Sequence, residues 1–82
     1  MVWHSLNQRQ TESRKRLSAL TPRELEIVSM TIEGLPNKVI ARRLAISLRT
    51  VEHHKTNILN KTGAVNSLEL SKLVQDSGLS IG

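Results

Sequence analysis

The sequence of 82 residues contains no cysteine, and Trp3 is its single aromatic residue. The absence of cysteine excludes disulfide scaffolds and thiolate metal sites. The near absence of aromatic side chains means that a core has to be built from Leu, Ile, Val and Ala. No apolar run approaches the roughly 20 residues that span a bilayer. Residues 1–5 also lack the basic start and apolar stretch of a secretory signal. We therefore expect a cytoplasmic domain without a membrane partner.

The short length allows one domain with a small core. A chain of this size buries only about 60–65% of its unfolded surface, which leaves little room for a walled catalytic cavity. Catalysis also needs a base held against a nucleophile in a dry pocket. Ser47 and Ser71 are explained instead by helix caps or by surface positions. We predict that the chain is not an enzyme, that it needs no cofactor, and that it binds no small molecule.

Positive charge is concentrated in two segments. The net charge is +5, and residues 34–63 alone hold six Lys or Arg against Glu52, while residues 1–20 carry a further net +3. Residues 21–33 and 64–82 are both net negative. A concentrated basic segment favours a polyanionic partner such as nucleic acid, although a plain solvated face would look the same.

Capping signals predict where the first firm helix lies, at about residues 22–33. Thr21-Pro-Arg-Glu24 is a capping box, in which the cap side chain and the third helical residue bond each other's backbone. Pro22 suits the first helical position. Gly34 supplies the left-handed residue that ends the helix. The predicted buried stripe consists of Leu25, Val28 and Ile32, with Ile27 or Met30 beside it.

Three more helices are predicted at about 37–45, 48–62 and 67–77. Ser47 caps the third helix and Gly63 stops it, and Asn66 caps the fourth. We therefore predict an all-α fold, a compact four-helix domain over residues 20–79. Residues 1–19 read as a basic polar linker that could be helical.

The second and third helices form a predicted helix-turn-helix over residues 37–62. Only residues 45–47 separate them, which forces a sharp corner. Ala41, Ile46 and Val51 have the packing spacing of this motif, and Ile58 continues the inner face. At about 100° per residue, the opposite side of the third helix carries hydrogen-bonding groups of the kind that read base edges. They belong to Arg49, His53, Thr56 and Asn60.

Several motifs together carry a family resemblance. They are Leu20-Thr-Pro-Arg-Glu24, Gly34-Leu-Pro-Asn-Lys38, Ile40-Ala41, Ile46-Ser47, Arg49-Thr-Val51, His54 and Asn57-Ile58. From about Leu20 to Leu79 the sequence resembles the LuxR-type, or FixJ/NarL-type, DNA-binding domain, and most of all the FixJ-like two-component response regulators. The resemblance implies sequence-specific binding of double-stranded DNA by a dimer, and control of transcription. It also implies a preceding phosphoacceptor domain, with residues 1–19 resembling the end of its linker.

The resemblance assigns roles to individual residues of the recognition helix and its surroundings. The implied base contacts are Glu52, His53 and Thr56. The implied phosphate contacts are Lys38, Arg49, Thr50, Lys55, Asn57 and Lys61. Three positions depart from the usual pattern: Glu52 replaces a commonly basic residue, Thr62 stands where Leu or Met is usual, and Ala45 replaces a frequent Gly in the turn.

Other interpretations stay open for parts of the sequence. The apolar surplus of the last helix suggests a homodimer surface, with Leu68, Leu73, Val74 and Ser77 as candidates, although ordinary core is the alternative. His53 and His54 point about 100° apart on a helix and have no third ligand nearby, so we predict no metal site. His54 is expected to be a half-buried packing residue. A protein–protein interaction module and a sigma-factor-like promoter-recognition domain are the rival functions, and RNA polymerase is a further candidate partner.

Overall fold

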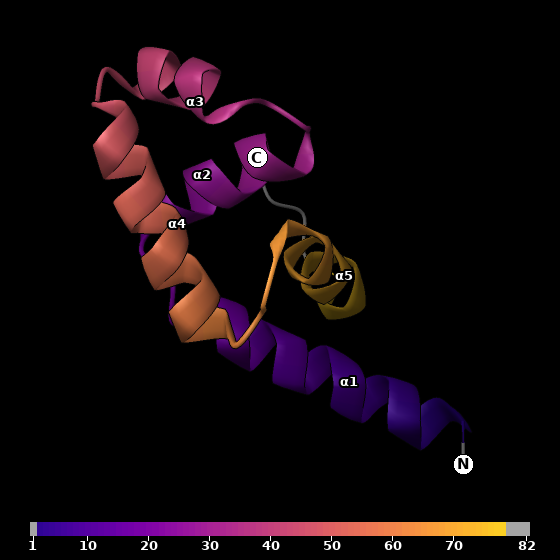
Figure 1. Cartoon of the computed structure of the whole chain (residues 1–82). Coiled ribbons are helices and arrows are strands. Elements are labelled where there is room, and N and C mark those ends of the chain that lie inside the picture. The colour runs from indigo at the N-terminus through magenta and orange to yellow at the C-terminus, as the bar shows by residue number, and fades with distance from the viewer. Residues whose placement is uncertain (1, 79–82) are drawn as a thin grey trace.

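The computed structural model describes the backbone of residues 2–78 and the side chains of residues 10–78. Within that range the chain consists of five helices and no strand: α1 (Val2–Leu17), α2 (Pro22–Ile32), α3 (Asn37–Leu44), α4 (Leu48–Thr62) and α5 (Ser67–Ser77) (Figure 1). The predicted all-α class is confirmed. The predicted domain end at Leu79 lies outside the described residues.

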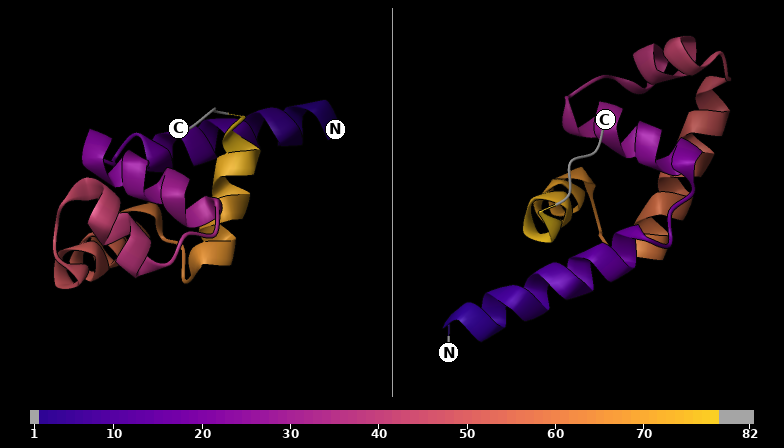
Figure 2. Two further views of the ribbon diagram at one scale, coloured as in Figure 1. Left: turned by 90° about the horizontal axis from the view of Figure 1, so that it is seen from above. Right: turned by 180° about the vertical axis from the view of Figure 1, so that it is seen from behind.

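Helix α1 is the main difference from the sequence-based expectation. Residues 1–19 read as a basic polar linker that could be helical; residues 2–17 form a helix, and α1 packs against α5 more extensively than any other two helices of residues 2–78 pack together (Figure 2). Ser13 and Leu17, four residues apart and therefore on one helix face, are 4% and 2% exposed. Most residues of this segment are polar, so the sequence predicts a linker that could be helical and does not indicate a helix packed into the domain.

Helix α2 begins with the predicted capping box. The amide of Glu24 donates to Thr21 Oγ1 at 3.1 Å, and the amide of Thr21 donates to Glu24 Oε1 at 2.8 Å. The predicted stripe needs a correction, because Ile27 is fully buried while Ile32 is 38% exposed. Ile32 follows Ile27 by five residues, which places it about 140° around the helix from Ile27 and at the margin of the buried face. Leu25 is half-buried, and Val28 is fully buried.

The corner between α3 and α4 is built on a left-handed alanine. Ala45 has φ 55° and ψ 42°, a region that L-residues other than Gly, Asn and Asp rarely adopt. This conformation lets the amide of Ile46 donate to the carbonyl of Ala41 at 3.0 Å. Ser47 then caps α4, with its Oγ accepting from the amide of Thr50 at 3.1 Å. The chain thereby turns into α4 within three residues.

The core lies where α2, α3, α4 and α5 meet, and α1 closes one end of it. Val51 and Ile58, on the inner face of α4, are 0% and 1% exposed. Thr62 continues this face at 1% exposure, and its hydroxyl donates to the carbonyl of Ile58 at 2.8 Å, so its burial leaves no unpaired donor. Among residues 10–78 the other buried apolar side chains are Leu17, Leu20, Ile27, Val28, Ile40, Ala41, Ala64 and Leu70. None of the helices in residues 2–78 has both the length and the apolar character needed to cross a membrane.

Candidate nucleic-acid interface

The outer face of α4 is exposed along its length. Helices α2 and α5 lie on the same side of α4 in Figure 1, and no other helix of residues 2–78 covers the opposite side. Its exposed side chains are Arg49, Glu52, His53, Thr56 and Asn60. A helix whose inner face is fully packed and whose outer face offers polar groups to solvent can be inserted into the major groove, which admits an α-helix.

All three predicted base-contact residues lie on this outer face. Glu52, His53 and Thr56 are exposed. The Thr56 hydroxyl donates to the carbonyl of Glu52 at 3.1 Å, so its oxygen still offers lone pairs to an outside donor. His54 is half-buried, as its position next to the inner face predicts. In residues 10–78 no three His, Cys, Asp or Glu side chains are grouped so that they could hold a metal ion.

The predicted phosphate contacts divide into two groups. In the first, Lys38, Arg49, Thr50 and Asn57 form no ion pair within residues 10–78; in the second, the amines of Lys55 and Lys61 turn toward other parts of the domain. Lys38, in the first turn of α3, and Arg49, in the first turn of α4, are exposed and belong to none of the ion pairs formed by residues 10–78. Thr50 is half-buried, and its hydroxyl shares a 2.8 Å hydrogen bond with the Ser47 hydroxyl. Because Arg49 and Thr50 are in the first turn of α4, they lie at the positive end of its dipole, where anions are favoured. Asn57 is half-buried.

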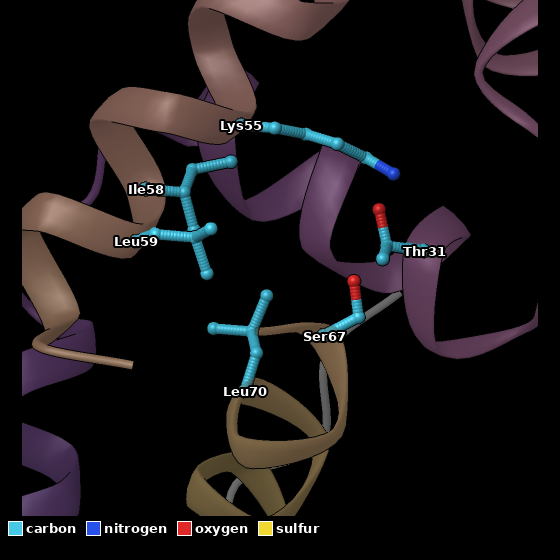
Figure 3. A pocket seen from close by; sticks show the side chains of 6 residues that line it. All are labelled: Thr31, Lys55, Ile58, Leu59, Ser67 and Leu70. Atoms are coloured by element: carbon cyan, nitrogen blue, oxygen red, sulfur yellow. The ribbon is translucent and has the colours of Figure 1, made fainter. Parts of the chain in front are cut away.

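Lys55 belongs to the second group, because its side chain runs along the inner side of the molecule. It lines a small pocket between α2, α4 and α5, and its amine extends toward Thr31 of α2 (Figure 3). The pocket volume of about 20 Å³ suits roughly one water. Burial lowers the pKa of the Lys55 amine, because a low-dielectric environment disfavours the charged form. The geometry thus separates Lys55 from the exposed face of His53 and Thr56.

Lys61 is also engaged inside the domain. Its Nζ donates to Glu24 Oε1 at 2.8 Å, and the side chain of Glu24 is only 4% exposed. Burial alone would raise the pKa of Glu24, but the hydrogen bonds from Lys61 and Thr21 and the positive charge of Lys61 outweigh it and lower the pKa. Sequence reasoning assigned Glu24 to the capping box and missed this ion pair. A carboxylate is rarely buried without a partner, but the burial of Glu24 follows from the packing of α2 against α4 and is not visible in the sequence.

The predicted dimer candidates on α5 differ in exposure. Leu68 is 65% exposed, and Leu73 and Val74 are half-buried. Ser77 is fully buried; its carbonyl accepts from Arg14 Nε at 2.8 Å and its hydroxyl donates to the carbonyl of Val74. The structure alters the expectation for Ser77, because in this conformation α1 covers the end of α5. Val65, which precedes α5, is more exposed than Leu68, at 72%, and the dimer candidates predicted from the sequence did not include it.

The fold and the corner define the class of domain. An all-helical chain in which a three-residue turn joins two helices, with the second presenting a polar outer face, is a helix-turn-helix domain. Residues 18–74 match the profile of the bacterial regulatory proteins of the luxR family. The chain belongs to this family, and the resemblance inferred from its motifs is confirmed.

Individual relatives agree with this membership. The chain is 57% identical over 51 residues to the monoamine regulon transcriptional regulator of Klebsiella aerogenes, a match covering 62% of the chain and 22% of the relative. It is 39% identical over 64 residues to the transcriptional regulatory protein FixJ of Bradyrhizobium diazoefficiens, covering 78% and 31%. The crystal structure of full-length FixJ from B. japonicum superimposes with a TM-score of 0.77 at 33% identity, covering 90% of this chain and 38% of that one. The chain thus spans well under half the length of these proteins.

Proposed function

We propose that this chain is the DNA-binding output domain of a two-component response regulator. In this proposal it binds double-stranded DNA sequence-specifically as a homodimer, with α4 in the major groove. The observation that carries the proposal is the uncovered polar face of α4 on a helix whose other face is locked into the core. Membership of the luxR family supports it, as do the 39% identity and the shared fold with FixJ. We expect the cytoplasm as its compartment and RNA polymerase as a further candidate partner.

The chemistry of base reading follows from the exposed groups. Glu52 accepts a hydrogen bond from the exocyclic amine of cytosine, for which a carboxylate is a suitable partner. His53 offers its ring nitrogens to a neighbouring base edge, and Thr56, whose hydroxyl donates to the carbonyl of Glu52, offers an acceptor oxygen. Each specific contact of this kind contributes about 1–3 kcal/mol of discrimination against a wrong base.

Phosphate contacts orient α4 in the groove. Lys38 and Arg49 carry the positive charge, and Thr50 and the first amides of α4 add hydrogen-bond donors at the positive end of its dipole. Asn57, at the margin of the outer face, is a further candidate. Lys55 and Lys61 are left out of this set, because the amine of one points toward Thr31 and that of the other is bonded to Glu24.

A symmetric dimer would read two half-sites about one helical turn, roughly 34 Å, apart. Leu68 offers the most exposed apolar surface on α5, with Leu73 and Val74 beside it. Ser77 is excluded from this surface as long as α1 stays packed on α5.

A salt titration with matched lysine variants tests the proposal. The affinity of the whole chain for a binding duplex and for an unrelated duplex is measured by fluorescence anisotropy between 50 and 200 mM salt. Lys38→Ala should weaken binding to both duplexes alike and reduce the slope of log K against log salt by about 0.9. Lys72→Ala, which changes an exposed lysine on α5, is the control and should alter neither. The proposal fails if the unsubstituted chain binds both duplexes equally at physiological ionic strength, or if Lys38→Ala changes nothing.

A further inference from the structure

One buried carboxylate oxygen joins two distant parts of the fold. Glu24 Oε1 accepts from the amide of Thr21, at the start of α2, and from Nζ of Lys61, in the last turn of α4, both at 2.8 Å. The two ends of the ion pair are 37 residues apart in the sequence. The Glu24 side chain is 4% exposed and that of Lys61 is 38% exposed, so the contact lies at the edge of the core and not on the open surface.

The ion pair lies at the end of α4 that is farthest from the corner with α3. At its N-terminal end α4 is held by the corner at Ala45–Ser47, and in its middle by the buried side chains Val51 and Ile58. At the C-terminal end, about 20 Å from the corner at 1.5 Å per residue, Thr62 is buried and the ion pair of Lys61 adds a contact to Glu24 of α2. A helix fixed at both ends has a defined direction. The positions of the side chains on its outer face depend on that direction.

A phosphate contact by Lys61 would break this arrangement. If the amine turned to DNA, Glu24 would lose its only cationic partner among residues 10–78 while its carboxylate stayed buried. An uncompensated buried charge is strongly unfavourable. Lys61 also lies about 140° around the helix from Thr56, away from the outer face. The ion pair of Lys61 with Glu24 carries no net charge. Lys61 in this pair therefore releases no counterion when DNA binds.

We infer that Lys61 serves DNA binding as a positioning residue, which through Glu24 fixes the C-terminal end of α4 against the start of α2 so that His53 and Thr56 meet the bases in register. It does not contact phosphate. This inference rests on the proposed function, and it differs from the phosphate role that the family resemblance implies for the same position.

Salt dependence separates positioning from phosphate contact. The affinity of the whole chain for its specific duplex is measured between 50 and 200 mM salt for Lys61→Met, Lys61→Arg and Glu24→Gln, with Lys72→Met as the control, at a temperature where circular dichroism shows every variant folded. Lys61→Met should lower specific affinity roughly 3- to 10-fold and leave the salt slope unchanged. Lys61→Arg, which keeps the cation, should restore affinity.

The partner variant gives a second criterion. Glu24→Gln should weaken specific binding as Lys61→Met does, and the double variant should be no weaker than either single one, because both remove the same contact. The inference is overturned if Lys61→Met reduces the salt slope by about 0.9, as loss of one phosphate contact requires. It is also overturned if Glu24→Gln, which frees the lysine, binds as tightly as the unsubstituted chain.

A measurement without DNA keeps the inference separate from the proposed function. In the free protein, Lys61→Met should shift the NMR amide signals of His53, Thr56 and Asn60 on α4, and Lys72→Met should not. If the unsubstituted chain prefers no duplex, the proposed function fails. The NMR shifts then still test whether the ion pair positions α4. Unchanged amide signals on α4 would overturn the positioning role even if DNA binding is established.

Discussion

The guanidinium Nε of Arg14 in α1 donates a 2.8 Å hydrogen bond to the carbonyl oxygen of Ser77, the last residue of α5. The last carbonyls of a helix have no partner within that helix, and a cation beside them is favoured by the helix dipole. The contact therefore satisfies the end of α5 and ties α1 to it. Together with the burial of Leu17, it makes α1 a packed element and not a free leader.

Replacing Leu17 by alanine tests whether α1 is part of the folded unit. Leu17 is 2% exposed, so Leu17→Ala should lower the free energy of unfolding by about 2–4 kcal/mol. Leu68→Ala, at a side chain that is 65% exposed, is the control and should change it by no more than about 0.5 kcal/mol. Urea unfolding followed by circular dichroism gives both values. Equal effects of the two substitutions would mean that α1 does not pack as described.

The Glu24–Lys61 ion pair predicts a loss of stability in acid. Because the pKa of Glu24 is lowered in the folded chain from its usual 4.5, the unfolded chain binds the proton more readily. The stabilisation is therefore fully present above pH 4.5 and declines as the pH falls below that value toward the folded pKa. Unfolding experiments at a series of pH values should show this decline in the native sequence.

Two glutamine variants isolate the source of the acid effect. Glu24→Gln should lower stability at neutral pH and flatten the pH dependence below 4.5, since its side chain cannot titrate. Glu26→Gln, at an exposed position two residues further along α2, should leave the decline in place. A Glu24→Gln variant with an undiminished acid transition would show that other groups are responsible.

Relief of backbone strain at the corner is a further expectation. Ala45 has a φ of 55°, and a residue with a Cβ atom is disfavoured there while glycine is not. Ala45→Gly should raise the free energy of unfolding by roughly 0.5–1 kcal/mol, after allowance for the greater freedom of glycine in the unfolded chain. Ala41→Gly, inside α3, should have the opposite sign, with a loss of about 1 kcal/mol or more. Thermal unfolding of the two variants compares them directly, and a destabilised Ala45→Gly chain would contradict the strain.

Much of the fold was predictable because its signals are local. Thr21, Ser47 and Asn66 each accept a hydrogen bond from the amide three residues later, as the sequence indicates. Gly34 and Gly63 adopt the positive φ values that end helices. These interactions span only a few residues, so the local sequence is sufficient to predict them.

The features that sequence reasoning missed depend on contacts between distant segments. Lys61 reads as a surface cation until Glu24, 37 residues away, is placed beside it. The direction of the Lys55 side chain depends on how closely α2 and α5 pack against α4. Ser77 is fully buried, and Arg14 of α1 is bonded to its carbonyl. In each case the residue type is right for the predicted role, and the tertiary packing decides what it contacts.

Base reading by α4 is tested by selecting duplexes from a random library with the whole chain at physiological ionic strength. We expect an enriched inverted repeat with half-sites about 34 Å apart. His53→Ala and Thr56→Ala should each relax the preference at particular base pairs, at a cost of about 1–3 kcal/mol. A library that shows no enriched sequence, or a motif that neither substitution alters, would contradict the assignment of base reading to the outer face of α4.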